Sequence, residues 1–260
     1  MKKILVALID AFASKVKRDP RGRKKAATTK EYLNVITKVL RSGMQWHLLE
    51  EKLHYTTYHK KHLEWCRLGI YRQAYKIALK CGKFNSTELR NLYIDSSMIK
   101  NIKGVDTVGP NHYDRYRSAT KVNVVVTATG IPLSVQIVKA SVHDSSLTSR
   151  AIDEIELKIV GSRVIADKGY ISEKQRIKCK KQSITLICPY RKNQKKQNTK
   201  KELMLLKDRY IVEHFFSWMK NYRKLRMRYD ALVASFEGFV MLACLDIVIS
   251  KRNITSLEFV

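Results

Sequence analysis

The spacing of apolar residues changes near residue 91, and this change divides the chain into two regions. Before it, apolar residues recur at helical spacing in three stretches separated by glycines. The stretches are Thr28–Leu40, which opens with the capping box TTKE, Thr56–Leu68, and a segment that ends at Cys81. Short helices with basic surfaces fit a helix-turn-helix-like module, although any small bundle gives the same pattern. We therefore assign residues 1–90 to an N-terminal helical, DNA-binding region and residues 91–260 to a second domain.

Beyond residue 91, short apolar runs rich in strand-forming residues alternate with helical segments. The runs are, in order, LYIDSSMI, KVNVVVTATG, IPLSVQIVKA, SRVIADKGY and SITLICPY. The second and third runs predict a hairpin around Thr129-Gly130. Helical segments between the later runs predict parallel strands with helices on the faces of the sheet. The fold class is therefore α/β, a mixed sheet flanked by helices, and ligands of such sheets collect at strand ends.

The stretch RYIVEHFFSWMKNYRK, residues 209–224, predicts a helix with a separate polar side. At 100° per residue, an apolar side forms from Ile211, Phe215, Trp218 and Tyr222. The opposite stripe carries one carboxylate among cations: Arg209, Glu213, Ser217, Lys220 and Lys224. A solvated face with paired charges gives the same pattern, so this helix alone does not identify a site.

The charge balance points to a polyanionic partner. Lys plus Arg number 51 against 23 for Asp plus Glu, and the formal net charge is +28. Such an excess favours nucleic acid as the partner, with an anionic membrane surface as the weaker alternative. The basic, Gly- and Pro-containing segment of residues 14–30 reads as a flexible arm that attracts phosphates.

The cysteines and apolar runs favour a reducing compartment. The five cysteines are scattered and include no CxxC pair, which argues against a disulfide framework and a zinc site. The late apolar run FVMLACLDIVIS is too short to span a bilayer and contains Asp246. Asp10 interrupts the first apolar run, which argues against a signal peptide. We expect a cytoplasmic, nucleoid-associated protein with no membrane partner.

Three carboxylates suggest a metal site. Asp95 and Asp167 lie on apolar strands, where an unpaired charge is costly, and Glu213 lies on the long helix. Magnesium binds carboxylate oxygens, and two such ions can clamp the reacting oxygens of a phosphoryl displacement. Taken singly, Asp95 could bond a backbone amide and Asp167 could form a turn. His143 and Asp144 could be a metal pair, although capping of the following helix by Asp144 is the favoured alternative. No glycine-rich phosphate loop is present, so we expect no nucleotide cofactor.

The motifs around the three acids are more specific in combination than any one of them alone. YIDSS, ADKGY and R-x3-E-x6-K (Arg209, Glu213, Lys220), followed by RKLRMRYD, resemble the DDE-class bacterial insertion-sequence transposases of the insertion sequence four and five families. Their order, spacing and strand or helix context agree over most of residues 91–245. The upstream stretch SGMQWHLLEEKLHYTTYHKKHLEWCRLGI also resembles the N-terminal helical region of that group.

The resemblance implies a ribonuclease H-like catalytic domain. Its first, second and third metal-binding acids match Asp95, Asp167 and Glu213, which would hold magnesium or manganese, as two ions. Arg209 and Lys220 match the basic residues that flank the glutamate and contact the transposon end. The other predicted DNA contacts are Arg223, Lys224, Lys168 and Lys121.

Two features limit the resemblance. The related signature has a tyrosine three residues before the arginine, and Leu206 stands there in this chain. About 45 residues separate Asp167 from Glu213, which leaves no room for a large inserted β-domain.

The resulting hypothesis is a transposase that cuts transposon-end DNA and joins the released 3′-hydroxyl to target DNA, as a homodimer on DNA. The alternatives are a catalytically inactive, transposon-derived DNA-binding protein and a structural RNA-binding protein of the ribosomal type. Convergence of the three acids would favour the enzyme, whereas dispersed acids beside intact basic stripes would favour the alternatives.

Overall fold

The computed structural model describes residues 2–15, 26–190 and 197–254, which form two compact units. The helical unit comprises Met1–Gly82, Ile102–Asp106 and Met219–Val260. The sheet unit comprises Lys83–Asn101 and Thr107–Trp218. Most of the predicted basic arm, residues 16–25, lies outside the described residues.

The sheet unit is a mixed sheet in which the five predicted strands keep their order and a short additional strand forms between the first two. Its strands are β1 (Asn91–Asn101), β2 (Gly109–Asn111), β3 (Arg117–Thr127), β4 (Pro132–Lys139), β5 (Arg163–Ile165) and β6 (Thr185–Ile187). They lie in the order β2-β3-β1-β5-β6, and β4 pairs with β3. The first three long strands are antiparallel neighbours, while β5 is parallel to both β1 and β6. The parallel pairing follows from the helical connections, because a crossover returns the chain in the same direction.

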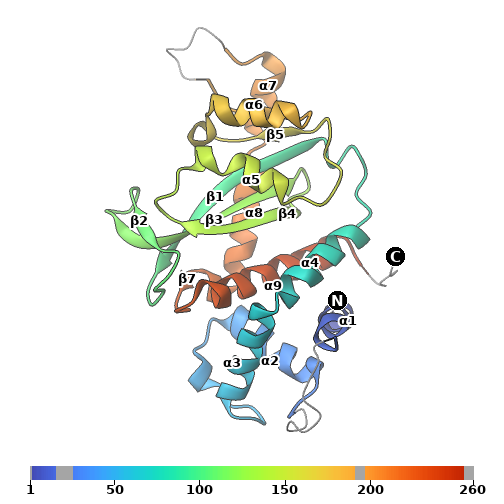
Figure 1. The fold of residues 1–260 in the computed structure, drawn as a ribbon, viewed down its shortest axis with the longest axis vertical. Helices are drawn as coiled ribbons and strands as arrows, with labels where there is room; N and C mark the ends of the chain where they lie inside the picture. The colour runs from blue at the N-terminus through green and yellow to red at the C-terminus, as the bar shows by residue number, and fades with distance from the viewer. Residues whose placement is uncertain (1, 16–25, 191–196, 255–260) are drawn as a thin grey trace. The chain divides into compact units, whose positions relative to one another are not determined.

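Helices cover both faces of this sheet. α5 (Thr148–Asp153) lies against β3 and β4, and α6 (Glu173–Lys181) packs beside β6. α7 (Lys200–Lys207) leads into α8 (Tyr210–Asn221), which passes behind the sheet in Figure 1. Because both faces are covered, β3 is buried almost continuously from Ala119 to Thr127.

Three predicted elements differ in detail. The segment RKNQKKQNTKK, residues 191–201, predicts a solvated basic loop, but α7 begins within it at Lys200, because Thr199 and Glu202 form a capping box. The helix expected over residues 209–224 ends at Asn221, and Arg209 lies in the turn before it. The helix expected after His143 is a 3₁₀ turn, η2 (Asp144–Ser146), followed by α5, and no side chain caps either one.

The helical unit gathers the N-terminal helices around the last helix of the chain. Its elements are α1 (Lys2–Ala13), α2 (Thr29–Ser42), η1 (Trp46–Leu48), α3 (Tyr55–Arg67), α4 (Ile70–Cys81), η4 (Arg223–Leu225), β7 (Met227–Arg228) and α9 (Val233–Lys251). The capping box predicted at Thr28 and Glu31 is present, and Gly43 ends α2 with a positive φ of 72°.

α9 explains why the C-terminal segment belongs to this unit. It is apolar on all sides, so it needs neighbours all round, and α3 and α4 pack on it. Its length and composition would allow it to cross a membrane, but 78% of its most apolar window is buried within the protein. A buried core helix of a folded protein has this character.

Candidate active site

Strand register places two of the three predicted acids side by side. In the parallel pair β1 and β5, Tyr93 lies opposite Ile165. Continuing this register by two residues brings Asp95 beside Asp167, which follows β5 and precedes the 3₁₀ turn η3 (Lys168–Tyr170). Residues two apart on a strand face the same side, so both carboxylates stand at the same end of the sheet.

A single guanidinium joins the two carboxylates. Arg209 Nη2 lies 3.4 Å from Asp95 Oδ2, and its Nη1 lies 3.0 Å from Asp167 Oδ1. The Asp95 side chain is 22% exposed and that of Asp167 is 49% exposed. Arg209 Nε is buried without a hydrogen-bond partner among the described residues. Each carboxylate therefore has a charged donor, whereas the arginine keeps one N–H group, at Nε, without a partner among the described residues.

Burial and neighbouring charges act in opposite directions on Asp95. Burial raises the pKa of its carboxyl, whereas the amide of Ser96 and the cation of Arg209 lower it. Ser96 N donates to Asp95 Oδ1 at 2.8 Å. The charges of Asp167 and Asp144 raise the pKa further. The result is a raised pKa, so a stronger cation at this point would stabilise the ionised carboxylate.

The third predicted acid lies on the helix that follows Arg209. Glu213 is exposed in the first turn of α8, four residues after Arg209. Within the described part of the chain, no group of three or more Asp, Glu, His or Cys side chains is arranged to hold a metal. The roles of the three acids as metal ligands therefore stay predictions.

The donor set nevertheless fits a hard divalent cation. Carboxylate oxygens of Asp95 and Asp167 converge on one positive group, the guanidinium of Arg209, which stands where a shared cation would bind. Magnesium takes one or two carboxylates and completes its shell with water and phosphate oxygens. Glu213 lies one helical turn from Arg209, so displacement of the arginine would involve the segment that carries the third acid.

A fourth carboxylate, Asp144, reaches the same region. Its Oδ1 accepts from Ser96 Oγ at 2.9 Å and from Lys121 Nζ at 2.8 Å. The capping role expected for Asp144 is wrong, because its carboxylate binds these distant side chains instead. The sequence signal was the His143-Asp144 pair, but nothing local to it revealed Lys121 as the partner.

The side chains predicted to contact DNA fall into an exposed group and a buried group. Lys220, Arg223 and Lys168 are exposed. Lys121 and Lys224 are buried, which differs from their expected role. Lys224 lies 3.2 Å from Asp230 and faces the ring of Phe239, while Lys121 binds Asp144. A buried lysine with an internal partner cannot reach a phosphate without first breaking that pair.

The apolar side expected for the helix over residues 209–224 is also shifted. Trp218 is 39% exposed, whereas Val212, Phe216 and Met219 are buried together with Phe215. The buried side of α8 therefore runs along Val212, Phe215, Phe216 and Met219, and it is centred closer to Val212 than the periodicity alone indicated.

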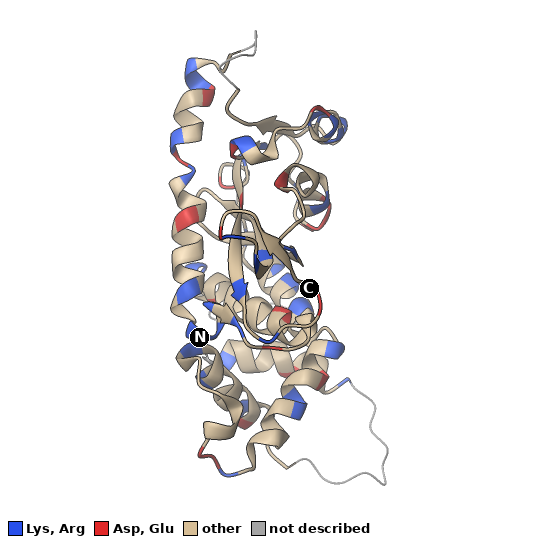
Figure 2. Cartoon of the chain, turned by 90° about the vertical axis from the view of Figure 1, so that its left-hand side faces the viewer, with Lys and Arg blue, Asp and Glu red and all other residues tan. Residues whose placement is uncertain are grey.

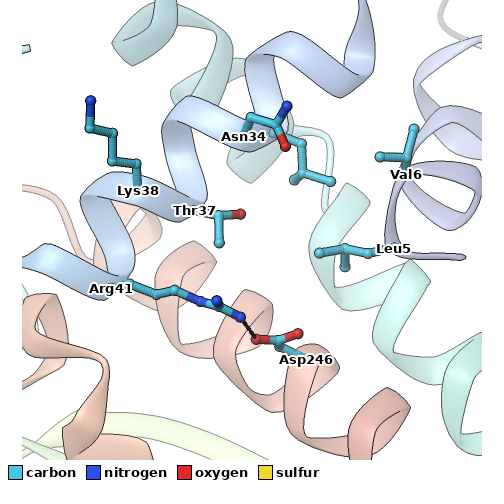
Figure 3. A pocket seen from close by; sticks show the side chains of 8 residues that line it. Leu5, Val6, Asn34, Thr37, Lys38, Arg41 and Asp246 are labelled. Carbon is cyan, nitrogen blue, oxygen red and sulfur yellow. Dashed lines mark hydrogen bonds and ion pairs between the residues drawn. The ribbon is translucent and has the colours of Figure 1, made fainter. Parts of the chain in front are cut away.

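The helical unit contains a separate cavity of about 150 Å³ (Figure 3). It is lined by Leu5, Val6, Leu33, Asn34, Thr37, Lys38, Arg41 and Asp246. Asp246 is buried, and its Oδ2 accepts from Arg41 Nη2 and Tyr222 Oη, each at 2.8 Å. Its lining includes none of the three predicted acids, and the ion pair inside it secures α9 to α2.

A ribonuclease H-like fold is the class that this architecture defines, with a mixed sheet, helices on both faces and acids at the ends of adjacent parallel strands. Consistent with this class, the piggyBac transposase in its synaptic complex with hairpin DNA is a structural neighbour. The two share a TM-score of 0.56 at 8% sequence identity, over 99% of this chain and 74% of that one.

Sequence comparisons identify the family. Residues 89–245, more than half of the chain, match the family model of the transposase DDE domain. A protein assigned as the transposase for insertion sequence element IS402 of Burkholderia cepacia is 30% identical over 167 residues, which cover 61% of this chain and 74% of that protein. A protein assigned as the transposase for IS6501 of Brucella ovis is 30% identical over 126 residues, covering 48% of this chain and 94% of that protein. The chain belongs to the transposase DDE domain family, and the predicted resemblance to bacterial insertion-sequence transposases is confirmed.

Proposed function

We propose that the protein is a metal-dependent transposase that cuts DNA at transposon ends and joins them to target DNA. The observation that carries this proposal is the pairing of Asp95 with Asp167 at the ends of adjacent parallel strands. Both carboxylates bind the guanidinium of Arg209. Membership of the DDE family supports an enzyme with DNA as its partner. Neither the inactive DNA-binding protein nor the ribosomal type of RNA-binding protein is favoured by any of these findings.

Asp95, Asp167 and Glu213 would hold the divalent cations, magnesium or manganese. Two such ions would activate the attacking oxygen and stabilise the leaving oxygen of an in-line displacement. In the first reaction, water attacks the phosphorus, the P–O3′ bond breaks, and a 3′-hydroxyl is released. In the second, that hydroxyl attacks a phosphorus of target DNA and displaces another 3′-oxygen. No covalent protein intermediate is required.

Arg209 would change its partner during this cycle. A divalent cation held by Asp95 and Asp167 would compete with the guanidinium for these carboxylate oxygens. The planar fork of arginine also suits a phosphate, so the released side chain can bind the DNA brought to the acids. This exchange reconciles its contact with the carboxylates and its predicted contact with the transposon end.

Exposed cations of both units would attract the phosphates of DNA. Lys and Arg positions are spread over the helices of both units (Figure 2). Exposed Lys220, Arg223 and Lys168 are the available phosphate contacts among the predicted residues. We further propose that the protein acts as a homodimer on DNA, in the cytoplasm, without a nucleotide cofactor.

Substitution of the acids tests this function. Asp95→Asn, Asp167→Asn and Glu213→Gln should each abolish magnesium-dependent cleavage of transposon-end DNA while DNA affinity is largely retained. Glu173→Gln is the matched control, because Glu173 is also an exposed acid in the first turn of a helix, α6. Cleavage by all three acid variants at the rate of the unaltered protein would contradict the proposal.

The alternative function has a distinct outcome. An inactive DNA-binding protein would bind transposon-end DNA, but neither the unaltered chain nor the Glu173→Gln control would cut it with magnesium or manganese. Sequencing the DNA that flanks the gene for short inverted repeats would supply the substrate for this assay.

A further inference from the structure

Asp144 connects three segments of the sheet unit. It begins η2, shortly after β4, and its Oδ1 receives hydrogen bonds from Lys121 on β3 and Ser96 on β1. The ammonium of Lys121 also donates to the carbonyl of Val142. The lysine therefore fixes both the backbone before Asp144 and the carboxylate of Asp144 itself.

These bonds lead directly to the two paired acids. The amide of Ser96, whose hydroxyl binds Asp144, donates to Asp95 Oδ1 at 2.8 Å. On the other side, a Cβ at Gly169 would lie 3.4 Å from Asp144 Oδ2, so η2 packs directly on the turn that follows Asp167. Asp144 thus lies against Ser96, the residue after Asp95, and against Gly169, two residues after Asp167.

Stability alone does not explain this arrangement. The side chain of Lys121 is 3% exposed and that of Asp144 is 20% exposed. A buried ion pair gains little over apolar residues of similar volume, because desolvation offsets its attraction. Its distinctive property is fixed geometry, since Lys121 and Ser96 both donate to Asp144 Oδ1 and the buried lysine also donates to the carbonyl of Val142.

We infer that Asp144, held by Lys121, is a positioning residue that orients Asp95 through Ser96 toward Asp167 and the shared cation. It acts without contacting that cation, because Oδ1 is occupied by two donors and Oδ2 faces Gly169. The inference rests on the proposed function, in which Asp95 is a metal ligand.

Binding of Mn²⁺ to the full-length protein, measured by isothermal titration calorimetry without DNA, tests this role. Ser96→Ala and Asp144→Asn should each raise the dissociation constant of Mn²⁺ about tenfold, the scale for loss of an outer-shell contact. The double variant should bind Mn²⁺ no more weakly than the weaker-binding of the two single variants. Both changes interrupt the same connection from Asp144 through Ser96 to Asp95. Ser118→Ala is the matched control, because Ser118 is a strand serine of β3 whose Oγ accepts from Asn101 Nδ2 instead of donating to Asp144.

A second pair of variants separates positioning from folding. Lys121→Met combined with Asp144→Asn removes both charges of the buried pair, so the melting temperature should recover relative to Lys121→Met alone. Mn²⁺ affinity should remain about tenfold weakened, because the orienting carboxylate is still absent. A merely structural role would restore affinity together with the melting temperature.

The outcomes distinguish this inference from the proposed function. Unchanged Mn²⁺ affinity of Asp144→Asn, or effects of Ser96→Ala and Asp144→Asn that add in full, would overturn the positioning role; full additivity would indicate a direct ligand. No Mn²⁺ binding by the unaltered protein, or unchanged binding by Asp95→Asn, would overturn the proposed function and this inference with it.

Discussion

Replacement of Arg209 by methionine should lower the free energy of unfolding in the absence of metal. It should also increase the stabilisation that added metal provides. The variant removes the guanidinium that joins Asp95 and Asp167 but retains most of the side-chain volume. The half-exposed pair with Asp167 is worth about 0.5 kcal/mol, because water screens it. The mostly buried Asp95 loses its charged donor, at a cost of about 1.5 kcal/mol. Together the free energy of unfolding should fall by about 2 kcal/mol.

Magnesium should reverse this loss. Under the proposed function, a divalent cation would have to displace Arg209 in the unaltered protein, whereas in Arg209→Met the same carboxylates would already be available. Removal of about 2 kcal/mol of competition corresponds to roughly 30-fold tighter apparent binding of Mg²⁺. Cleavage of bound DNA should nevertheless slow, because the scissile phosphate loses the arginine that would position it.

The assay is thermal unfolding over a Mg²⁺ titration, with single-turnover cleavage at saturating protein measured in parallel. Without metal, the melting temperature should fall by about 5 °C, since about 2–4 °C corresponds to each kcal/mol at this chain length. Arg176→Met is the matched control, because Arg176 donates to Tyr190 and contacts neither acid. If Arg209→Met and the control respond equally to Mg²⁺, Arg209 does not compete with a cation, and the proposed exchange is refuted.

The remaining predictions concern the helical unit. Burial lowers the pKa of His62 to about 4, below its usual 6.5, so protonation favours the unfolded state. The free energy of unfolding should therefore drop by up to about 3 kcal/mol between pH 6.5 and 4, and His62→Gln should flatten this dependence in chemical denaturation. A Cβ on Gly238 would lie 2.2 Å from Cys66 Sγ, so Gly238→Ala should destabilise by about 1–3 kcal/mol and Cys66→Ala should restore most of it. Arg41→Met should cost about 1–2 kcal/mol by leaving the buried Asp246 without its cation, and Asp246→Asn in the same chain should recover part of it, by thermal melting.

Each of these predictions has a contradicting result. The same acid sensitivity in His62→Gln would exclude His62 as its source. Additive losses in the Gly238 and Cys66 double variant would show that the helices do not meet at this contact. An unchanged melting temperature of Arg41→Met would mean that Asp246 is satisfied in another way.

The order of elements could be predicted from local sequence. The capping box at Thr28, the apolar runs of the strands and the helical segments between them each depend on neighbours in the chain, so their patterns are visible without a structure. The same holds for the presence of Asp95 and Asp167 on apolar strands, because a charge in such a run is conspicuous. Family motifs added the expectation that Glu213 joins them, which stays a prediction, while the structure pairs Asp95 and Asp167 on Arg209.

Tertiary structure decided which charges face each other. Lys121 and Lys224 resemble any other cation in a chain of net charge +28, and only packing turns them inward onto Asp144 and Asp230. Parallel register sets Asp95 beside Asp167 across 72 positions of sequence. Register and burial depend on the packing of segments distant in the chain, and side-chain periodicity carries information only about the residues within one helix or strand.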